Sequence, residues 1–169
     1  FMGTLIHIYP GGYMSHEKDY ARFFSYLNLF CGAMLVLVLG DSLPVMFVGW
    51  EGVGLCSYLL IGFWYKEAKN GYAARKAFII TRVGDAAMAV GLFLLFQELN
   101  TLRIQDIANQ APLAWTVGAP TATLIAILLL GGAVGKSAQL PLQSWLPDAM
   151  AGPSPMSGLI HAASMLTAG

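Results

Sequence analysis

Charged residues are scarce in this chain, and their scarcity decides its broad class. Asp, Glu, Lys and Arg make up 11% of the 169 residues, whereas an ordinary soluble domain carries about 25%. Hydrophobic residues reach 57%, and the mean hydropathy is +0.64. So little polar surface excludes a water-soluble globular protein and predicts several membrane spans. The charges of the nine basic and nine acidic residues cancel. The chain therefore lacks the excess of positive charge that is typical of a protein that binds nucleic acid.

Cysteine is also nearly absent. Cys31 and Cys56 are the only two, both lie in apolar runs, and neither belongs to a Cys-x-x-Cys or metal-ligand spacing. We expect two unpaired thiols in membrane helices. The sequence also has no dinucleotide-binding fingerprint, no iron–sulfur cysteine set and no histidine pair suited to haem. We therefore expect that this chain binds no cofactor or metal and carries no electrons.

A nucleotide-binding P-loop is excluded, although Gly135-Lys136-Ser137 ends like one. The P-loop pattern Gly-x-x-x-x-Gly-Lys-Ser/Thr needs a glycine five residues before Gly135, and that position is Leu130. The segment before the lysine is also an apolar run as long as a membrane helix, whereas a P-loop follows a short strand.

Apolar runs separated by polar or proline-rich stretches predict an all-α polytopic membrane protein with an antiporter-like helix bundle. Spans of about 17–25 residues fit a bilayer, and Pro10-Gly11-Gly12 is expected to end the first helix. Pro141 predicts a broken helix in the segment Lys136–Pro141. We expect a single membrane domain over 1–169, a fragment incomplete at both ends, with helices at about 1–9, 23–39, 43–65, 77–99, 121–140 and 154–169.

Small residues precede the lysine. Gly131 and Gly135 stand four residues apart in the apolar run, a spacing that lets two membrane helices approach closely. We expect this segment to pack against another helix. The glycines alone do not decide whether the space serves packing only or also brings polar groups together.

Five ionisable residues interrupt the apolar runs. A charged group at the centre of a membrane helix costs about 2.5–3.5 kcal/mol on insertion scales, and a neutral histidine costs less. Such residues are therefore candidates for function. They fall on four expected helices, and their charges cancel if histidine is neutral, which favours a relay: Glu51, Arg82, Asp85, Lys136 and His161.

The chemistry of these residues suits proton transfer. We predict that Glu51 and Lys136 pair between two helices. Burial favours the neutral forms of both groups, and their mutual attraction favours the charged forms. A lysine whose carboxylate partner moves can therefore take up a proton in one state and release it in another. His161 is the predicted next carrier, since imidazole titrates near neutral pH.

Arg82 and Asp85 are three residues apart and share a helix face. They are a supporting charge pair with two possible roles. The pair either neutralises itself so that its helix can insert, or tunes the neighbouring relay. A purely structural role for all the charges, holding helices in register, also stays open.

Four long motifs carry a family resemblance. They are Gly49–Trp64, Ile80–Asp85, Gly135–Asp148 and Leu159–Gly169. The chain resembles the antiporter-like large membrane subunit of respiratory complex I, NADH-quinone oxidoreductase, in its bacterial subunit L form. The resemblance extends over essentially the whole chain and implies a fragment covering roughly transmembrane helices 3 to 8.

The resemblance also implies positions for the candidate residues. Glu51 would lie on the family's fifth helix, Arg82 and Asp85 on the sixth, Lys136 on the broken seventh and His161 on the eighth. The implied function is proton translocation through this Glu/Lys/His relay, coupled to quinone reduction elsewhere in the complex.

The same resemblance implies partners and a location. NADH, FMN, iron–sulfur clusters and quinone would belong to other subunits, so this chain would be part of an enzyme without a redox centre of its own. Its partners would be neighbouring antiporter-like subunits of the membrane arm and the lipid bilayer. The bacterial inner membrane is expected, ahead of a mitochondrial or thylakoid membrane. The alternative is a subunit of a secondary cation/proton antiporter without redox partners.

Overall fold

The computed structural model describes residues 2–158, 160 and 168–169, most of which are helical. Within these residues no β-strand is formed, which confirms the predicted all-α class. In chain order the elements are α1 (Met2–Tyr13), α2 (Tyr20–Leu39), α3 (Leu43–Ile61), α4 (Ala68–Leu99), α5 (Ile104–Ala114), α6 (Pro120–Lys136), the 3-10 turns η1 (Gln143–Trp145) and η2 (Asp148–Ala151), and α7 (Ser154–Gly158).

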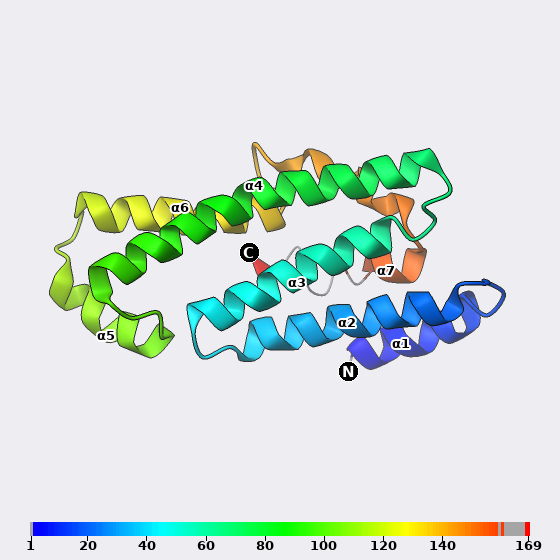
Figure 1. Ribbon diagram of the computed structural model, residues 1–169, viewed down its shortest axis with the longest axis horizontal. Coiled ribbons are helices and arrows are strands. Elements are labelled where there is room, and N and C mark those ends of the chain that lie inside the picture. The colour runs from blue at the N-terminus through cyan, green and yellow to red at the C-terminus, as the bar shows by residue number, and fades with distance from the viewer. Residues whose placement is uncertain (1, 159, 161–167) are drawn as a thin grey trace.

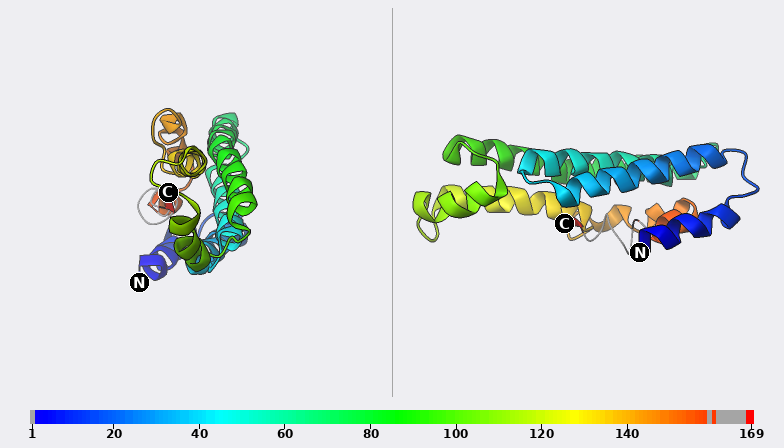
Figure 2. Two further views of the ribbon diagram at one scale, coloured as in Figure 1. Left: turned by 90° about the vertical axis from the view of Figure 1, so that its left-hand side faces the viewer. Right: turned by 90° about the horizontal axis from the view of Figure 1, so that it is seen from below.

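The long helices run along one common axis (Figure 1). In the right-hand view of Figure 2, α2, α3 and α4 form one layer, and α1, α6 and the 3-10 turns form a second. The broadest contacts join α2 to α3 and α4 to α6. By length and composition α2, α3 and α4 are each able to cross a membrane, and α6 is a shorter apolar helix. The chain is therefore a membrane protein.

The main core lies between these layers. It contains fully buried aromatic and aliphatic side chains from α2, α3 and the segment after α6, among them Phe23, Phe30, Leu60 and Trp145. Large apolar side chains also cover the outside, with Leu39 76% and Phe93 74% exposed. An apolar exterior around a packed core is the arrangement expected where lipid replaces water as the solvent.

Several helix bounds differ from the sequence predictions, and the helix expected at 43–65 ends at Ile61. The first helix does not end at Pro10 but continues to Tyr13, because a proline removes only one backbone bond while the following turn keeps its own. Met14 N, for example, donates to Pro10 O at 2.9 Å. The helix expected at 77–99 begins at Ala68. Most residues of 68–76 are strong helix formers, and Ala73 and Ala74 are buried against the core.

The connection between α4 and α6 also differs, since it holds the short helix α5. Its packing explains this, because Ile107 and Ala111 of α5 lie against the small cluster around Leu99 and Ile125. The polar composition of the connection concealed this apolar side of α5.

The predicted helix break is confirmed, and α6 ends at Lys136. Ala138 has a positive φ of 49°, which takes the chain out of the helical path before Pro141 is reached. Gln139 N donates to Val134 O at 3.0 Å, a bond typical of a Schellman helix end. The helix therefore stops through backbone reversal, four residues earlier than the sequence prediction of 140.

Glycines bring α4 and α6 into close contact next to this break. A Cβ added at Gly84 of α4 would lie 2.7 Å from Gly131 O and 3.1 Å from the Cα of Gly135. No side chain fits in that space, so the predicted close packing of Gly131 and Gly135 is confirmed, with α4 as the partner helix.

Replacing Gly84 is expected to force these two helices apart. Gly84→Ala should destabilise the full-length subunit by about 1–3 kcal/mol, the usual cost of overpacking. Gly71→Ala is the matched control in the same helix, since nothing lies within 4 Å of its added Cβ. Thermal unfolding of the two purified variants would measure the difference. Equal unfolding midpoints would contradict the close packing.

Candidate functional site

Lys136 is the last residue of α6 and its side chain is buried, with 1% exposed. The C-terminal end of a helix carries a partial negative charge, which favours an ammonium there. The side chain extends onto α3 at Gly54, where an added Cβ would lie 2.5 Å from Lys136 Nζ. A side chain at this position of α3 would require the end of the lysine side chain to shift.

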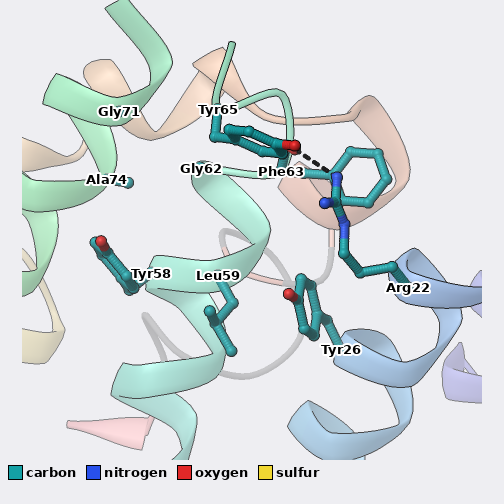
Figure 3. A pocket seen from close by; sticks show the side chains of 9 residues that line it. All are labelled: Arg22, Tyr26, Tyr58, Leu59, Gly62, Phe63, Tyr65, Gly71 and Ala74. Carbon is teal, nitrogen blue, oxygen red and sulfur yellow. Dashed lines mark hydrogen bonds between the residues drawn. The ribbon is translucent and has the colours of Figure 1, made fainter. Parts of the chain in front are cut away.

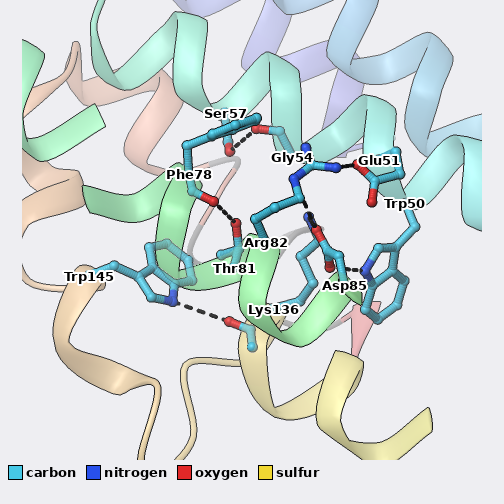
Figure 4. A network of polar contacts seen from close by, with 11 residues as sticks. Trp50, Glu51, Gly54, Ser57, Phe78, Thr81, Arg82, Asp85, Lys136 and Trp145 are labelled. Carbon is cyan, nitrogen blue, oxygen red and sulfur yellow. Dashed lines mark hydrogen bonds and ion pairs between the residues drawn. The ribbon is translucent and has the colours of Figure 1, made fainter. Parts of the chain in front are cut away.

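The ion partner of Lys136 is Asp85 of α4. Lys136 Nζ lies 3.3 Å from Asp85 Oδ2, and both side chains are 1% exposed. The other carboxylate oxygen, Oδ1, accepts a 2.6 Å hydrogen bond from the indole Nε1 of Trp50 on α3. Lys136 Nζ also lies 5.9 Å from the centre of the Trp50 ring, within reach of a cation–π attraction. Three helices thus meet at one buried ion pair (Figure 4).

A second ion pair lies beside the first and is closer to the surface. Arg82 of α4 contacts Glu51 of α3 directly, with 38% and 26% of the two side chains exposed. The Arg82 guanidinium also lies over the ring of Phe78. Its Nε is 4.0 Å from Asp85 Oδ2, so the two pairs are joined. The four charges form one connected set without net charge.

The pairing therefore differs from the sequence prediction. The sequence predicts that Glu51 pairs with Lys136, but Glu51 forms an ion pair with Arg82, and Lys136 pairs with Asp85. The difference follows from burial. The buried ammonium of Lys136 pairs with the buried carboxylate of Asp85, and the two half-exposed side chains pair with each other. Arg82 and Asp85 approach each other only at 4.0 Å, so each is held mainly by a residue of another helix. His161 lies outside the described residues.

Sequence reasoning missed Trp50. The signal was present, because a tryptophan in the middle of an apolar run tends to be buried and its N–H then needs an acceptor. Trp50 directly precedes Glu51, so one turn of α3 supplies a contact to each of the two charged residues of α4. Neighbouring positions of α3 thus hold Asp85 and Arg82 in separate pairs.

The segment after α6 is fixed over the same region by two bonds. The indole Nε1 of Trp145 donates to Gly135 O at 3.2 Å. Lys76 of α4 forms an ion pair of 2.6 Å with Asp148 of η2. These contacts return the chain against α4 after the helix break and hold the end of α6 in place.

A separate cavity of about 190 Å³ lies between α2, the end of α3 and the start of α4 (Figure 3). Its cation, Arg22, is already engaged, since it donates to Phe63 O at 3.2 Å and to Asp19 at 2.9 Å. Its guanidinium also lies over the rings of Phe63 and Tyr65. These contacts join α2 to the turn after α3.

The geometry of the four charged residues permits a proton to be held or released at Lys136. Asp85 has two cations within reach of one oxygen, and Lys136 can hold or release a proton while Arg82 keeps its own. A change at the half-exposed pair can therefore alter the charge balance at the buried pair. Within the described residues no group of three or more His, Cys, Asp or Glu side chains is arranged to hold a metal ion.

The sequence profile described as NADH:quinone oxidoreductase/Mrp antiporter, TM, matches residues 40–169. A second profile, described as NADH-Ubiquinone oxidoreductase (complex I), chain 5 N-terminus, matches residues 1–24. The two matches leave only residues 25–39 uncovered.

Similar proteins agree with these profiles. The chain is 61% identical over 168 residues to NADH-quinone oxidoreductase subunit L of Pseudomonas aeruginosa and 58% identical to that of Escherichia coli. Each match covers 99% of this chain and 27% of the relative, so the chain spans about a quarter of their length. The solved structure of an Mrp complex from a Dietzia species matches with a TM-score of 0.77 and 34% identity, covering 85% of this chain and 15% of that chain.

Loss of the buried carboxylate should be costly. Asp85→Asn leaves the ammonium of Lys136 without its counterion, which typically costs about 3–5 kcal/mol. The double variant with Lys136→Met should recover much of that loss. Asp41→Asn is the control, because it breaks an ion pair with Arg103 whose side chains are 79% and 65% exposed, worth at most about 1 kcal/mol. Thermal unfolding of the full-length subunit would compare them, and equal costs would contradict a charged buried pair.

Proposed function

Because the chain belongs to the NADH:quinone oxidoreductase/Mrp antiporter transmembrane family, we propose that it is part of a proton-translocating membrane subunit of an NADH:quinone oxidoreductase. The observation that carries the proposal is the buried Lys136–Asp85 ion pair, linked through Arg82 to Glu51. The relatives named as subunit L support the choice of a redox-coupled complex.

Two cations can compete for Asp85. At an effective dielectric constant of about 20, charges separated by 3.3 Å and 4.0 Å attract by roughly 5 and 4 kcal/mol. These energies are close, so a small movement of Arg82 can change which cation the carboxylate stabilises. Glu51 controls that movement, since it holds Arg82 on its other side.

The proposed cycle follows from this competition. When Arg82 stays with Glu51, Asp85 stabilises the ammonium of Lys136 and the lysine keeps its proton. When Arg82 moves onto Asp85, the ammonium loses its counterion in a buried position, and the neutral amine becomes favoured. The proton leaves Nζ toward the next carrier, for which His161 is proposed. Return of Arg82 to Glu51 allows Lys136 to take up another proton.

The redox centres of the proposed complex are assigned to other chains. In the proposal, NADH, FMN, iron–sulfur clusters and quinone belong to other subunits, and neighbouring antiporter-like subunits of the membrane arm are the partners. The bacterial inner membrane is the proposed location, as the Pseudomonas aeruginosa and Escherichia coli relatives are bacterial. Redox energy would reach this chain as a change in the Glu51–Arg82 pair.

A second function is supported by the similarity to an Mrp complex. In that case the chain would be part of a secondary cation/proton antiporter and would need no redox partner. Purification of the full-length protein from its native membrane would separate the two functions. Flavin, iron–sulfur clusters and peripheral subunits that copurify would support the oxidoreductase, and their absence from an intact complex would support the antiporter.

Substitution of the lysine tests the relay. In the full-length subunit within its complex, Lys136→Ala should slow proton transfer through this subunit by about 100-fold or more, as expected for loss of a positioned proton carrier. Lys136→Arg should cause a similar loss, because arginine holds its proton. The rate of proton pumping, measured in sealed vesicles together with the rate of NADH oxidation, would report both. Lys18→Ala, in the exposed loop before α2, is the control.

The arginine variant also separates the relay from a structural role. An arginine keeps the positive charge beside Asp85, so charges that only hold helices in register would leave pumping intact. Normal assembly with normal pumping in Lys136→Ala or Lys136→Arg would overturn the proposed function. Glu51→Gln should reduce pumping less than Lys136→Ala does, because Glu51 acts through Arg82.

A further inference from the structure

The indole of Trp50 lies beside the buried ion pair and points its N–H at Asp85 (Figure 4). The residue is 4% exposed. Its Nε1 donates to Asp85 Oδ1 at 2.6 Å, and the centre of its ring is 5.9 Å from Lys136 Nζ. The contact is short for an N–H···O bond, and hydrogen bonds to an ionised acceptor are shorter and stronger than those to a neutral one.

This bond fixes the orientation of the carboxylate. Asp85 Oδ2 lies 3.3 Å from Lys136 Nζ and 4.0 Å from Arg82 Nε. A carboxylate turns readily about its last side-chain bond, so without a second anchor Oδ2 could approach either cation. With Oδ1 held by the indole, Oδ2 faces Lys136 more closely.

We propose that Trp50 is a positioning residue that holds Asp85 on Lys136 and so sets the resting state of the relay. This inference rests on the proposed function. Loss of the N–H lets Asp85 divide its time between Arg82 and Lys136. The lysine then loses its counterion even when Glu51 has not released Arg82, and proton uptake no longer follows the state of the Glu51–Arg82 pair.

A large buried ring can also serve only to fill space, and two substitutions separate that role from the proposed one. Trp50→Phe keeps an aromatic ring and removes the donor. Trp50→His loses volume, but its five-membered ring overlies that of the indole and can place an N–H at the same point. A positioning role predicts more pumping in Trp50→His than in Trp50→Phe. A space-filling role predicts the reverse order.

The measurement is the rate of proton pumping in sealed vesicles, with the full-length subunit assembled in its complex. Trp50→Phe should slow proton transfer through this subunit by about tenfold or more, the effect of losing one hydrogen bond to a charged group. Trp115→Phe is the control, since it also changes an indole into a phenyl ring, but at a position in the separate small cluster around Leu99 and Ile125. That control should pump normally.

Thermal unfolding of the unchanged protein, the Trp50→Phe and Asp85→Ala variants and the double variant tests whether Trp50 acts through Asp85. Trp50→Phe should lower the unfolding midpoint of the otherwise unchanged protein and have little further effect after Asp85→Ala, which removes the acceptor. Independent, additive losses would overturn the inference.

The two proposals can fail separately. Normal pumping in Lys136→Ala would overturn the proposed function and the inference with it. Loss of pumping in Lys136→Ala, together with normal pumping in Trp50→Phe, would overturn the role of Trp50 alone.

Discussion

The packing of the site depends on one charged group whose burial costs free energy, the ammonium of Lys136. Only 1% of this side chain is exposed. Each neighbouring feature lowers the cost of burying it. Asp85 supplies the counterion, Trp50 supplies a donor to that carboxylate and a ring face to the ammonium, and the end of α6 supplies a partial negative charge. Gly54 leaves the space that the side chain needs.

The helix α4 links this buried group to the outside of the bundle. Arg82 and Asp85 stand on one face of α4 but are held by different helices. Close packing of Gly84 against α6 brings that face next to the lysine. Because two ion pairs share one rigid helix, a change in the outer pair reaches the inner pair over a separation of 4.0 Å.

Much of the fold follows from composition and local pattern. Long apolar runs with few charges predicted an all-α membrane bundle, and the helix break after Lys136 was predicted from the prolines that follow. The bounds that were missed have a common cause. In each case a local feature predicts a loop, but packing or backbone bonds stabilise a helix. The charged segment 68–76 contains buried Ala73, and the backbone bonds around Pro10 are intact. The polar segment before α6 forms α5, which has an apolar side.

The sequence alone determined which residues carry charge inside the apolar spans, because any such residue stands out against its neighbours. Only the tertiary structure decided their partners. Residues 51, 85 and 136 are far apart in the chain, and their pairing depends on the depth and rotation of three helices, which no local pattern encodes. The structure thus replaced the expected Glu51–Lys136 pair with two linked pairs. It also added Trp50, whose N–H acquires a role only because helix packing places it against Asp85.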